Sequence, residues 1–234
     1  MSIYAIADLH LSLGGSKPMD VFGPEWKDHA EKIRTNWDAA VSDSDLVLVA
    51  GDTSWAMRAE EALPDLQYVA ERPGRKILVR GNHDYWWKRD NTTKLQKLVD
   101  PSITLLHGQP LVFGGVGITG TRGWAKDAWA EWNSEEQNAK IFDRELARLR
   151  LGLESLPSGL DLKIAMLHFP PFSANLEPNE FFEAAREHSV DIIVYGHLHI
   201  PASAPRLEGD IEGVRLHLVA ADNLGFAPKM VVRS

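Results

Sequence analysis

Five short segments of this chain combine the side chains that bind divalent metal ions in proteins. They are Asp8-Leu9-His10, Gly51-Asp52, Gly81-Asn82-His83-Asp84, His168 before Pro170-Pro171, and Gly196-His197-Leu198-His199. Carboxylate oxygen, amide oxygen and imidazole nitrogen suit Mn, Fe, Zn and Ni, and the absence of cysteine excludes thiolate sites. Each segment alone is a weak signal. All five in this order, each after an apolar run, predict a site for two adjacent divalent ions.

The spacing within the first and last segments indicates how they hold a metal. In an extended segment, side chains two residues apart point to the same side. We therefore expect Asp8 and His10 to hold one ion together, and His197 and His199 to face the site from the opposite wall.

Two ions about 3.5–4 Å apart need a shared ligand between them. Asp52 follows a central strand and is the candidate bridge, while Asn82 contributes a neutral amide oxygen to the second ion. Two divalent cations outweigh the charges of Asp8, Asp52 and one bridging hydroxide. The centre therefore keeps a net positive charge, which attracts phosphate and holds a nucleophile of low pKa.

The third segment also carries the candidate acid. Adjacent side chains diverge, so His83 does not bind the metal if Asn82 does. We expect His83 to protonate the leaving oxygen, with Asp84 orienting its ring and keeping it cationic.

The segments between the motifs predict an α/β fold. Apolar runs predict strands at 3–7, 46–50, 76–79, 103–106, 110–113, 116–119, 162–167, 190–195, 214–219 and 229–232. Helical spacing predicts helices at 25–41, 59–70, 134–151 and 178–188, and a Ser134/Gln137 capping box begins the third. The early strands alternate with helices, as in parallel βαβ units, whose functional groups gather beyond the carboxyl ends of the strands.

The middle of the chain differs, because Gly108 and Gly114-Gly115 separate short strands and predict a hairpin meander. Two runs of strands with flanking helices then predict two stacked sheets with helices on both outer faces. No linker or repeat interrupts the sequence, so we expect a single domain over residues 1–234.

Composition excludes several classes of protein. With 44% hydrophobic and 25% charged residues, the chain is typical of a globular protein. No apolar stretch is long enough to span a bilayer and no signal peptide is evident, so we expect no membrane association. These features and the lack of cysteine favour a cytoplasmic protein. A net charge of −8 argues against binding long nucleic acid, but not against a small phosphorylated substrate.

The five segments resemble the motif set of the calcineurin-like metallophosphoesterase superfamily. This resemblance implies a four-layer α/β/β/α sandwich of two mixed sheets flanked by helices. It also implies a dinuclear site, in which one metal is held by Asp8, His10, Asp52 and His199 and the other by Asp52, Asn82, His168 and His197. A bridging hydroxide would attack phosphorus in line, and His83 would be the general acid. Mn²⁺ is the expected metal, with Fe, Zn or Ni as alternatives.

The chain departs from one branch of that superfamily. Protein Ser/Thr phosphatases carry an aspartate–arginine pair soon after the Gly-Asp motif, where this chain reads Thr53-Ser54-Trp55-Ala56-Met57-Arg58. The sequence is more similar to the small bacterial phosphohydrolase branch. We therefore expect a phosphatase or phosphodiesterase that acts on a small substrate rather than on a phosphoprotein, and the aromatic residues near the motifs favour a nucleotide-like one.

Four further residues are candidates for substrate contact. Trp55 and Trp86 could wall the cleft, and Arg58 and Arg122 could clamp phosphate oxygens. The alternatives are that the tryptophans pack loops onto the sheet and that the arginines are solvated.

A different class of function is a scaffold that keeps the fold, has lost the chemistry and binds a protein partner. Such a protein should have eroded ligand positions, and every position of the motif set is filled here. The sequence does not specify the oligomeric state.

Overall fold

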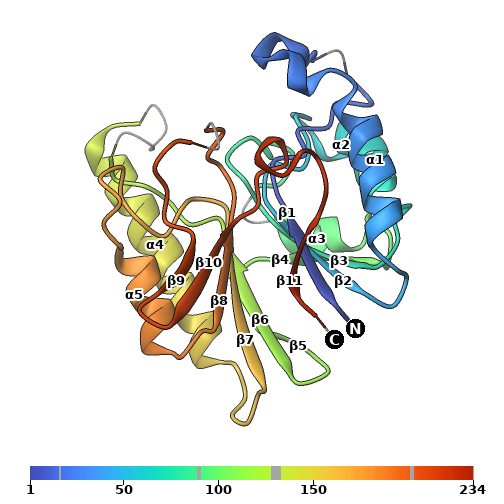
Figure 1. Cartoon of the computed structure of the whole chain (residues 1–234). Coiled ribbons are helices and arrows are strands. Elements are labelled where there is room, and N and C mark those ends of the chain that lie inside the picture. The colour runs from blue at the N-terminus through green and yellow to red at the C-terminus, as the bar shows by residue number, and fades with distance from the viewer. Residues whose placement is uncertain (16, 89–90, 128–132, 201–202, 234) are drawn as a thin grey trace.

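Two mixed β-sheets form the centre of the structure (Figure 1). The computed structural model describes the whole chain except residues 16, 89–90, 128–132, 201–202 and 234. The first sheet has the order β11-β1-β2-β3-β4, with β1 Ile3–Ile6, β2 Leu46–Ala50, β3 Arg75–Val79, β4 Ile103–Leu106 and β11 Lys229–Val232. The second has the order β5-β6-β7-β8-β10-β9, with β5 Leu111–Phe113, β6 Val116–Thr121, β7 Leu162–Leu167, β8 Ile192–Tyr195, β9 Gly209–Ile211 and β10 Val214–Leu218.

Each sheet is parallel in its interior. Strands β1 to β4 run parallel, and β11 closes the first sheet antiparallel to β1. In the second sheet β6, β7, β8 and β10 are parallel, with β5 and β9 antiparallel at the two edges. Both sheets are therefore mixed, as expected.

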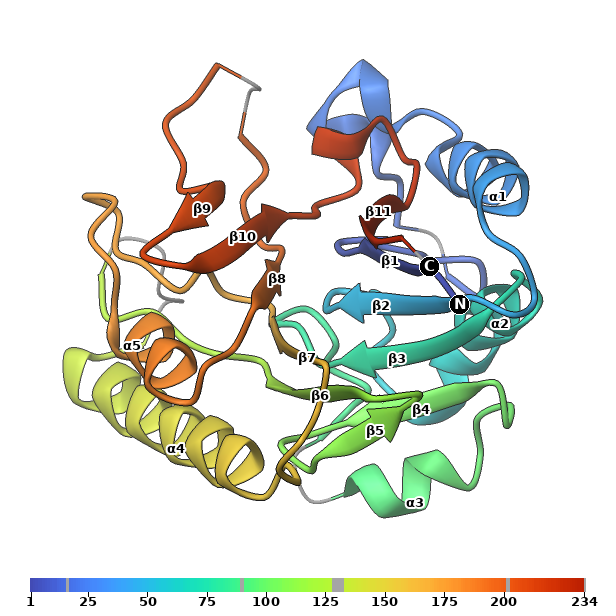
Figure 2. The same ribbon diagram turned by 60° about the horizontal axis from the view of Figure 1, so that its bottom comes forward.

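Helices cover the outer face of each sheet (Figures 1 and 2). The helices are α1 His29–Ala40, α2 Ala59–Ala70, α3 Thr92–Gln96, α4 Glu135–Glu154 and α5 Glu180–Glu187. The first three flank the first sheet, while α4 and α5 flank the second. The fold is thus the predicted α/β/β/α sandwich.

Alternation along the strands explains the layers. In β2, Val49 belongs to the core shared with α1 and α2, whereas Leu48 lies in the core between the two sheets. In β7, Ala165 packs in the core that includes α4 and α5, and Ile164 joins Leu48 between the sheets. Because both faces of these strands are buried, they are continuous apolar runs in the sequence.

Two expectations need correction, and two short elements are additional. The helix predicted from residue 25 begins at His29, because Gly23 and Pro24 lead into a separate 3-10 helix, η2 Pro24–Trp26. Strand β4 pairs in parallel with β3, so it belongs to the first sheet and not to a meander. Of the three strands β4, β5 and β6, only the last two form a hairpin. Strand β9 and helix α3, both short, were not predicted.

Within the described residues, no helix is long and apolar enough to cross a membrane.

The predicted capping box of α4 supplies a test of local stability. The Ser134 hydroxyl accepts a hydrogen bond from the Gln137 N–H, and the Gln137 side chain accepts one from the Ser134 N–H. Ser134→Ala should lower the free energy of unfolding by about 1 kcal/mol, measured by urea denaturation. Ser158→Ala, at an exposed loop position, is the control and should change it by less than about 0.5 kcal/mol. Equal effects of the two substitutions would contradict the assignment.

Candidate metal centre

The five sequence motifs meet at one end of the sandwich, beyond the carboxyl ends of five parallel strands. Strands β1, β2 and β3 of the first sheet precede the first three motifs, and β7 and β8 of the second precede the last two. Both sheets therefore contribute to one site, which is why its residues are so far apart in the sequence.

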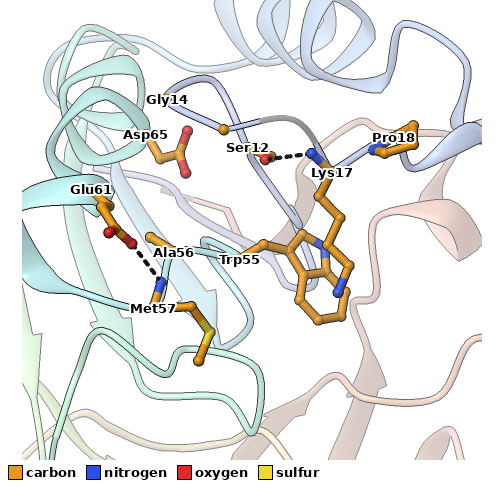
Figure 3. Close-up of a pocket in the computed structure, with 10 residues that line it drawn as sticks. Ser12, Gly14, Lys17, Pro18, Trp55, Ala56, Met57, Glu61 and Asp65 are labelled. Atoms are coloured by element: carbon orange, nitrogen blue, oxygen red, sulfur yellow. Dashed lines mark hydrogen bonds between the residues drawn. The ribbon is translucent and has the colours of Figure 1, made fainter.

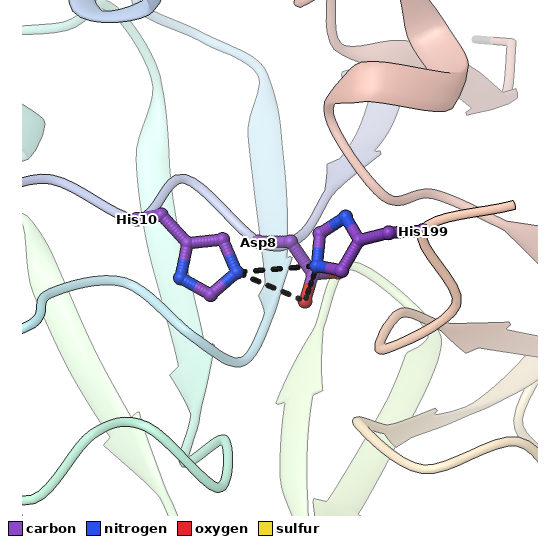
Figure 4. A group of neighbouring side chains, drawn as sticks. All are labelled: Asp8, His10 and His199. Atoms are coloured by element: carbon purple, nitrogen blue, oxygen red, sulfur yellow. Dashed lines mark hydrogen bonds and ion pairs between the residues drawn. The ribbon is translucent and has the colours of Figure 1, made fainter. Parts of the chain in front are cut away.

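The first group of ligand atoms comes from Asp8, His10 and His199 (Figure 4). The His10 Nε2 atom lies 3.2 Å from His199 Nε2 and 3.8 Å from Asp8 Oδ1. His199 Nε2 lies 3.6 Å from the same carboxylate oxygen. Ligand atoms bound about 2.1 Å from one ion are themselves about 3–4 Å apart, so these three atoms could share a cation.

The second group centres on Asn82. Its Oδ1 atom lies 2.6 Å from His168 Nε2 and 3.1 Å from His197 Nδ1. His168 Nδ1 lies 3.0 Å from the carbonyl oxygen of Ala50, to which it can donate. With that tautomer, the Nε2 lone pair and the Asn82 oxygen face each other, as two ligands of one cation do.

Asp52 lies between the two groups. Its Oδ2 atom is 3.7 Å from His10 Nε2 and 3.5 Å from His168 Nε2. Its other oxygen accepts a hydrogen bond from the His83 N–H at 2.8 Å, which fixes the orientation of the carboxylate. One oxygen of Asp52 is therefore within reach of both groups.

The chemistry of this donor set fits divalent ions. Burial lowers the pKa of His10 and of His168, so both rings are neutral and keep a lone pair for a metal. Burial raises the pKa of Asp8, and among the described residues no donor hydrogen-bonds to its buried Oδ1. An unsatisfied buried polar atom costs about 1–3 kcal/mol, which a cation at this position would offset.

The backbone is unusual at the same residues. Asp8, His10, Asp52 and His197 all have φ between +47° and +70°, a region that non-glycine residues seldom adopt. Strain of this kind gathers at functional sites. The left-handed backbone at Asp8 and His10 contradicts the expectation that these residues share an extended segment. The two side chains do converge, but through left-handed backbone, and His197 and His199 diverge to different groups.

Two motif glycines are required because neighbouring carboxylates approach the backbone closely. A Cβ atom on Gly81 would lie 1.9 Å from Asp52 Oδ1, and one on Gly196 would lie 2.4 Å from Asp8 Oδ2. Any larger residue would displace a candidate ligand.

The expected partnership of Asp84 with His83 is wrong. The buried Asp84 carboxylate accepts hydrogen bonds from the N–H groups of Thr53, Ser54 and Gly81 and from the Trp86 indole. The His83 ring instead contacts the Tyr85 hydroxyl through Nδ1 at 3.2 Å. Burial, then the charges of Lys17 and His199, lower the pKa of His83 to about 4, so Asp84 does not keep the ring cationic.

The candidate substrate residues divide into two groups. Trp86 is buried in the core and bonds Asp84, so it does not wall the cleft. Arg58 is exposed and lies 3.9 Å from Glu61, which matches the solvated alternative. Arg122 is buried with its guanidinium 4.2 Å from the Trp124 ring centroid, and its role in phosphate binding stays a prediction.

Trp55 is the candidate that does adjoin the centre. Its ring stacks on His10 at a centroid distance of 4.9 Å and lies 4.3 Å from the His83 ring. The ammonium group of Lys17 sits 3.3 Å from the indole centroid, beside a cavity of about 470 Å³ (Figure 3). Trp55 therefore contacts the candidate ligand His10, the candidate acid His83 and the ammonium group of Lys17.

Two residues at the site were not predicted from the sequence as part of it. Asp222 Oδ2 lies 3.1 Å from His199 Nδ1. Burial lowers the pKa of His199, but Asp222 and Asp8 outweigh that effect and raise it. Trp26 falls within the helix predicted at 25–41, yet its ring centroid lies 5.7 Å from that of His10 and 5.6 Å from that of His199. The Gly23-Pro24 break in the sequence could have shown that Trp26 lies before the helix, whereas no local pattern marks Asp222.

Asp222 should orient His199 for metal binding. Asp222→Ala should weaken Mn²⁺ binding about 10–100-fold, because partners of ligand histidines typically contribute that much. Asp222→Asn, which keeps an acceptor oxygen, should lose less. Titration of chelator-stripped protein measures both, with Asp143→Asn on the exposed face of α4 as the charge control. Wild-type affinity in Asp222→Ala would refute this role.

Several known proteins are similar to this chain in sequence or in structure. The gene 66 protein of Mycobacterium phage L5 is 31% identical over 80 residues, which is 33% of this chain and 37% of that protein. The structure of phosphopantetheinyl hydrolase (PptH) from Mycobacterium tuberculosis is similar with a TM-score of 0.60 and 20% identity, over 94% of this chain and 88% of that one. A protein of unknown function from Aquifex aeolicus, AQ665, gives 0.51 and 18%, over 97% and 94%.

At these identities the solved structures establish the fold alone. The family assignment comes from the sequence, since residues 1–201 match the profile of the calcineurin-like phosphoesterases. That range runs from β1 through the last histidine motif and includes all seven candidate ligands. The chain belongs to the calcineurin-like phosphoesterase family.

Proposed function

We propose that this protein hydrolyses phosphoric esters with two divalent ions held side by side. The observation that carries the proposal is the position of Asp52 Oδ2, 3.7 Å from His10 Nε2 in one group and 3.5 Å from His168 Nε2 in the other. A shared oxygen supports a coupled pair of ions rather than two independent sites. Family membership supports the same reaction class.

The donor set indicates what the bound ions contribute. Two divalent ions would supply a positive centre that attracts phosphate and lowers the pKa of a water molecule. The carboxylates of Asp8 and Asp52 only partly offset that charge, and the neutral amide of Asn82 leaves it unchanged. Oxygen and nitrogen donors suit Mn²⁺, and also Fe, Zn or Ni.

His83 is placed to handle the proton of the leaving group. Its ring centroid lies 5.7 Å from that of His10, and its Nδ1 atom contacts Tyr85, so Nε2 is the ring nitrogen that would serve a substrate. A bound phosphate ester is an anion and would favour the protonated ring, which opposes the lowering of the His83 pKa by burial. His83 can then give its proton to the ester oxygen as the bond to phosphorus breaks.

Removing the bridge tests the dinuclear arrangement. Asp52→Asn should bind at least one ion fewer than the wild type and lose nearly all Mn²⁺-dependent release of nitrophenol, because a neutral amide shares two cations poorly. Metal content per chain and hydrolysis of 4-nitrophenyl phosphate and bis(4-nitrophenyl) phosphate measure this. Faster hydrolysis of the monoester indicates a phosphatase, and faster hydrolysis of the diester indicates a phosphodiesterase. An Asp52→Asn protein that retained both ions would exclude the bridge.

Truncating the acid should separate chemistry from metal binding. His83→Ala should keep its metal content but lose about 10²–10⁴-fold in kcat for an alkyl ester, the usual contribution of a general acid. A nitrophenyl ester should lose much less, since its leaving group needs no proton. Loss of metal in His83→Ala would show that His83 is a ligand instead.

A further inference from the structure

A second cavity, of about 390 Å³, opens directly onto the candidate metal centre. Two of its lining residues, His10 and His199, are candidate ligands of that centre, and a third, His83, is the candidate acid. We call it the Trp26 pocket. Because two candidate ligands and the candidate acid line the pocket, it is continuous with the place where an ester bond would be broken.

The position of His83 decides which part of a substrate the Trp26 pocket receives. The acid must reach the ester oxygen that leaves phosphorus, so the group attached to that oxygen lies next to His83. With the phosphoryl group at the metal centre, the leaving group therefore occupies this pocket. The wall of the pocket should then select the leaving group.

That wall is mostly aromatic. Trp26 and Met19 are buried at 3% and 5% exposure, while Trp55 is partly exposed and Phe22 is 60% exposed. The Trp55 indole donates to the Met19 sulfur at 3.0 Å, which joins two lining residues that are far apart in the sequence. Aromatic side chains prefer flat partners in offset or edge-to-face contact.

Phe22 lies outside the hydrophobic cores of the described residues, although it lines the pocket. Its segment, η1 Asp20–Phe22, lies in the connection between β1 and α1. A large apolar side chain exposed at the rim of a concave site is typical of ligand contact. The carboxylates of Glu25 and Asp222 also line the pocket and disfavour a second negative charge in the ligand.

We propose that the Trp26 pocket selects phosphate esters whose leaving group is an uncharged, flat apolar ring, with Phe22 as a specificity-determining residue. This inference rests on the proposed ester hydrolysis. It goes further by assigning the chemical class of the leaving group and the segment that recognises it.

Leaving-group discrimination tests the proposal. Phenyl and 2-naphthyl esters have leaving groups of similar acidity, but the second has one more fused ring to bury. The Mn²⁺-loaded enzyme should have a kcat/KM roughly tenfold higher for the naphthyl ester, as expected for the added apolar area. Phe22→Ala should reduce that preference to about twofold. Because Phe22 is mostly exposed, its truncation should leave the thermal midpoint unchanged.

Val21→Ala is the matched control. Val21 is adjacent and 70% exposed, but it does not line the pocket, so the preference should stay at the wild-type value. A 3-carboxyphenyl ester tests the charge preference and should react at least about threefold more slowly than the phenyl ester at low salt. Equal or faster reaction would overturn the charge preference.

The same experiment separates failure of the pocket from failure of the enzyme assignment. Hydrolysis without ring preference, or a preference unchanged in Phe22→Ala, would overturn the pocket. If neither ester is hydrolysed, the proposed function fails, and ligand-observed NMR with 2-naphthol then tests the pocket. Binding weakened in Phe22→Ala but not in Val21→Ala would support it, and equal binding in both would overturn it.

Discussion

The position of a single carboxylate, that of Asp52, constrains the rest of the site. One of its oxygens is fixed by the His83 N–H, and the other lies within reach of histidines from both ligand groups. This geometry requires left-handed backbone at Asp52 and a glycine at position 81, where a Cβ atom would collide with the carboxylate. It also requires two stacked sheets, because His10 follows β1 of the first and His168 follows β7 of the second.

The sandwich stabilises a site that is costly to build. Buried imidazoles, the Asp8 carboxylate oxygen without a donor in the described chain, and the left-handed backbone of four motif residues lie together at one end of the sheets. The core between the sheets is apolar and nearly solvent-free; Leu48 and Ile164, for example, are fully buried. Local rules are broken where function needs them, and the regular strands beneath compensate for the cost.

Strand positions and candidate ligands could be predicted because both depend on local pattern. Apolar runs at 46–50, 103–106, 162–167 and 229–232 coincide with strands, and parallel strands bring the residues after them to one edge. Pairing is not local, so the sequence could not show that β4 joins β3 rather than β5. Nor could it show Asp222, which reaches His199 only through the course of the chain after β10.

Asp84 shows why motif residues need three-dimensional assignment. In sequence it neighbours the candidate acid, and a carboxylate beside a histidine suggests an orienting pair. In the structure it accepts N–H groups of Thr53 and Ser54 after the second motif and of Gly81 in the third. Asp84 therefore joins the two loops that carry Asp52 and Asn82, and so fixes the candidate bridge relative to the second group of candidate ligands. Asp84 thus supports the geometry of the candidate metal centre. The His83 ring instead contacts Trp55 and Tyr85, and burial followed by the charge of Lys17 lowers its pKa.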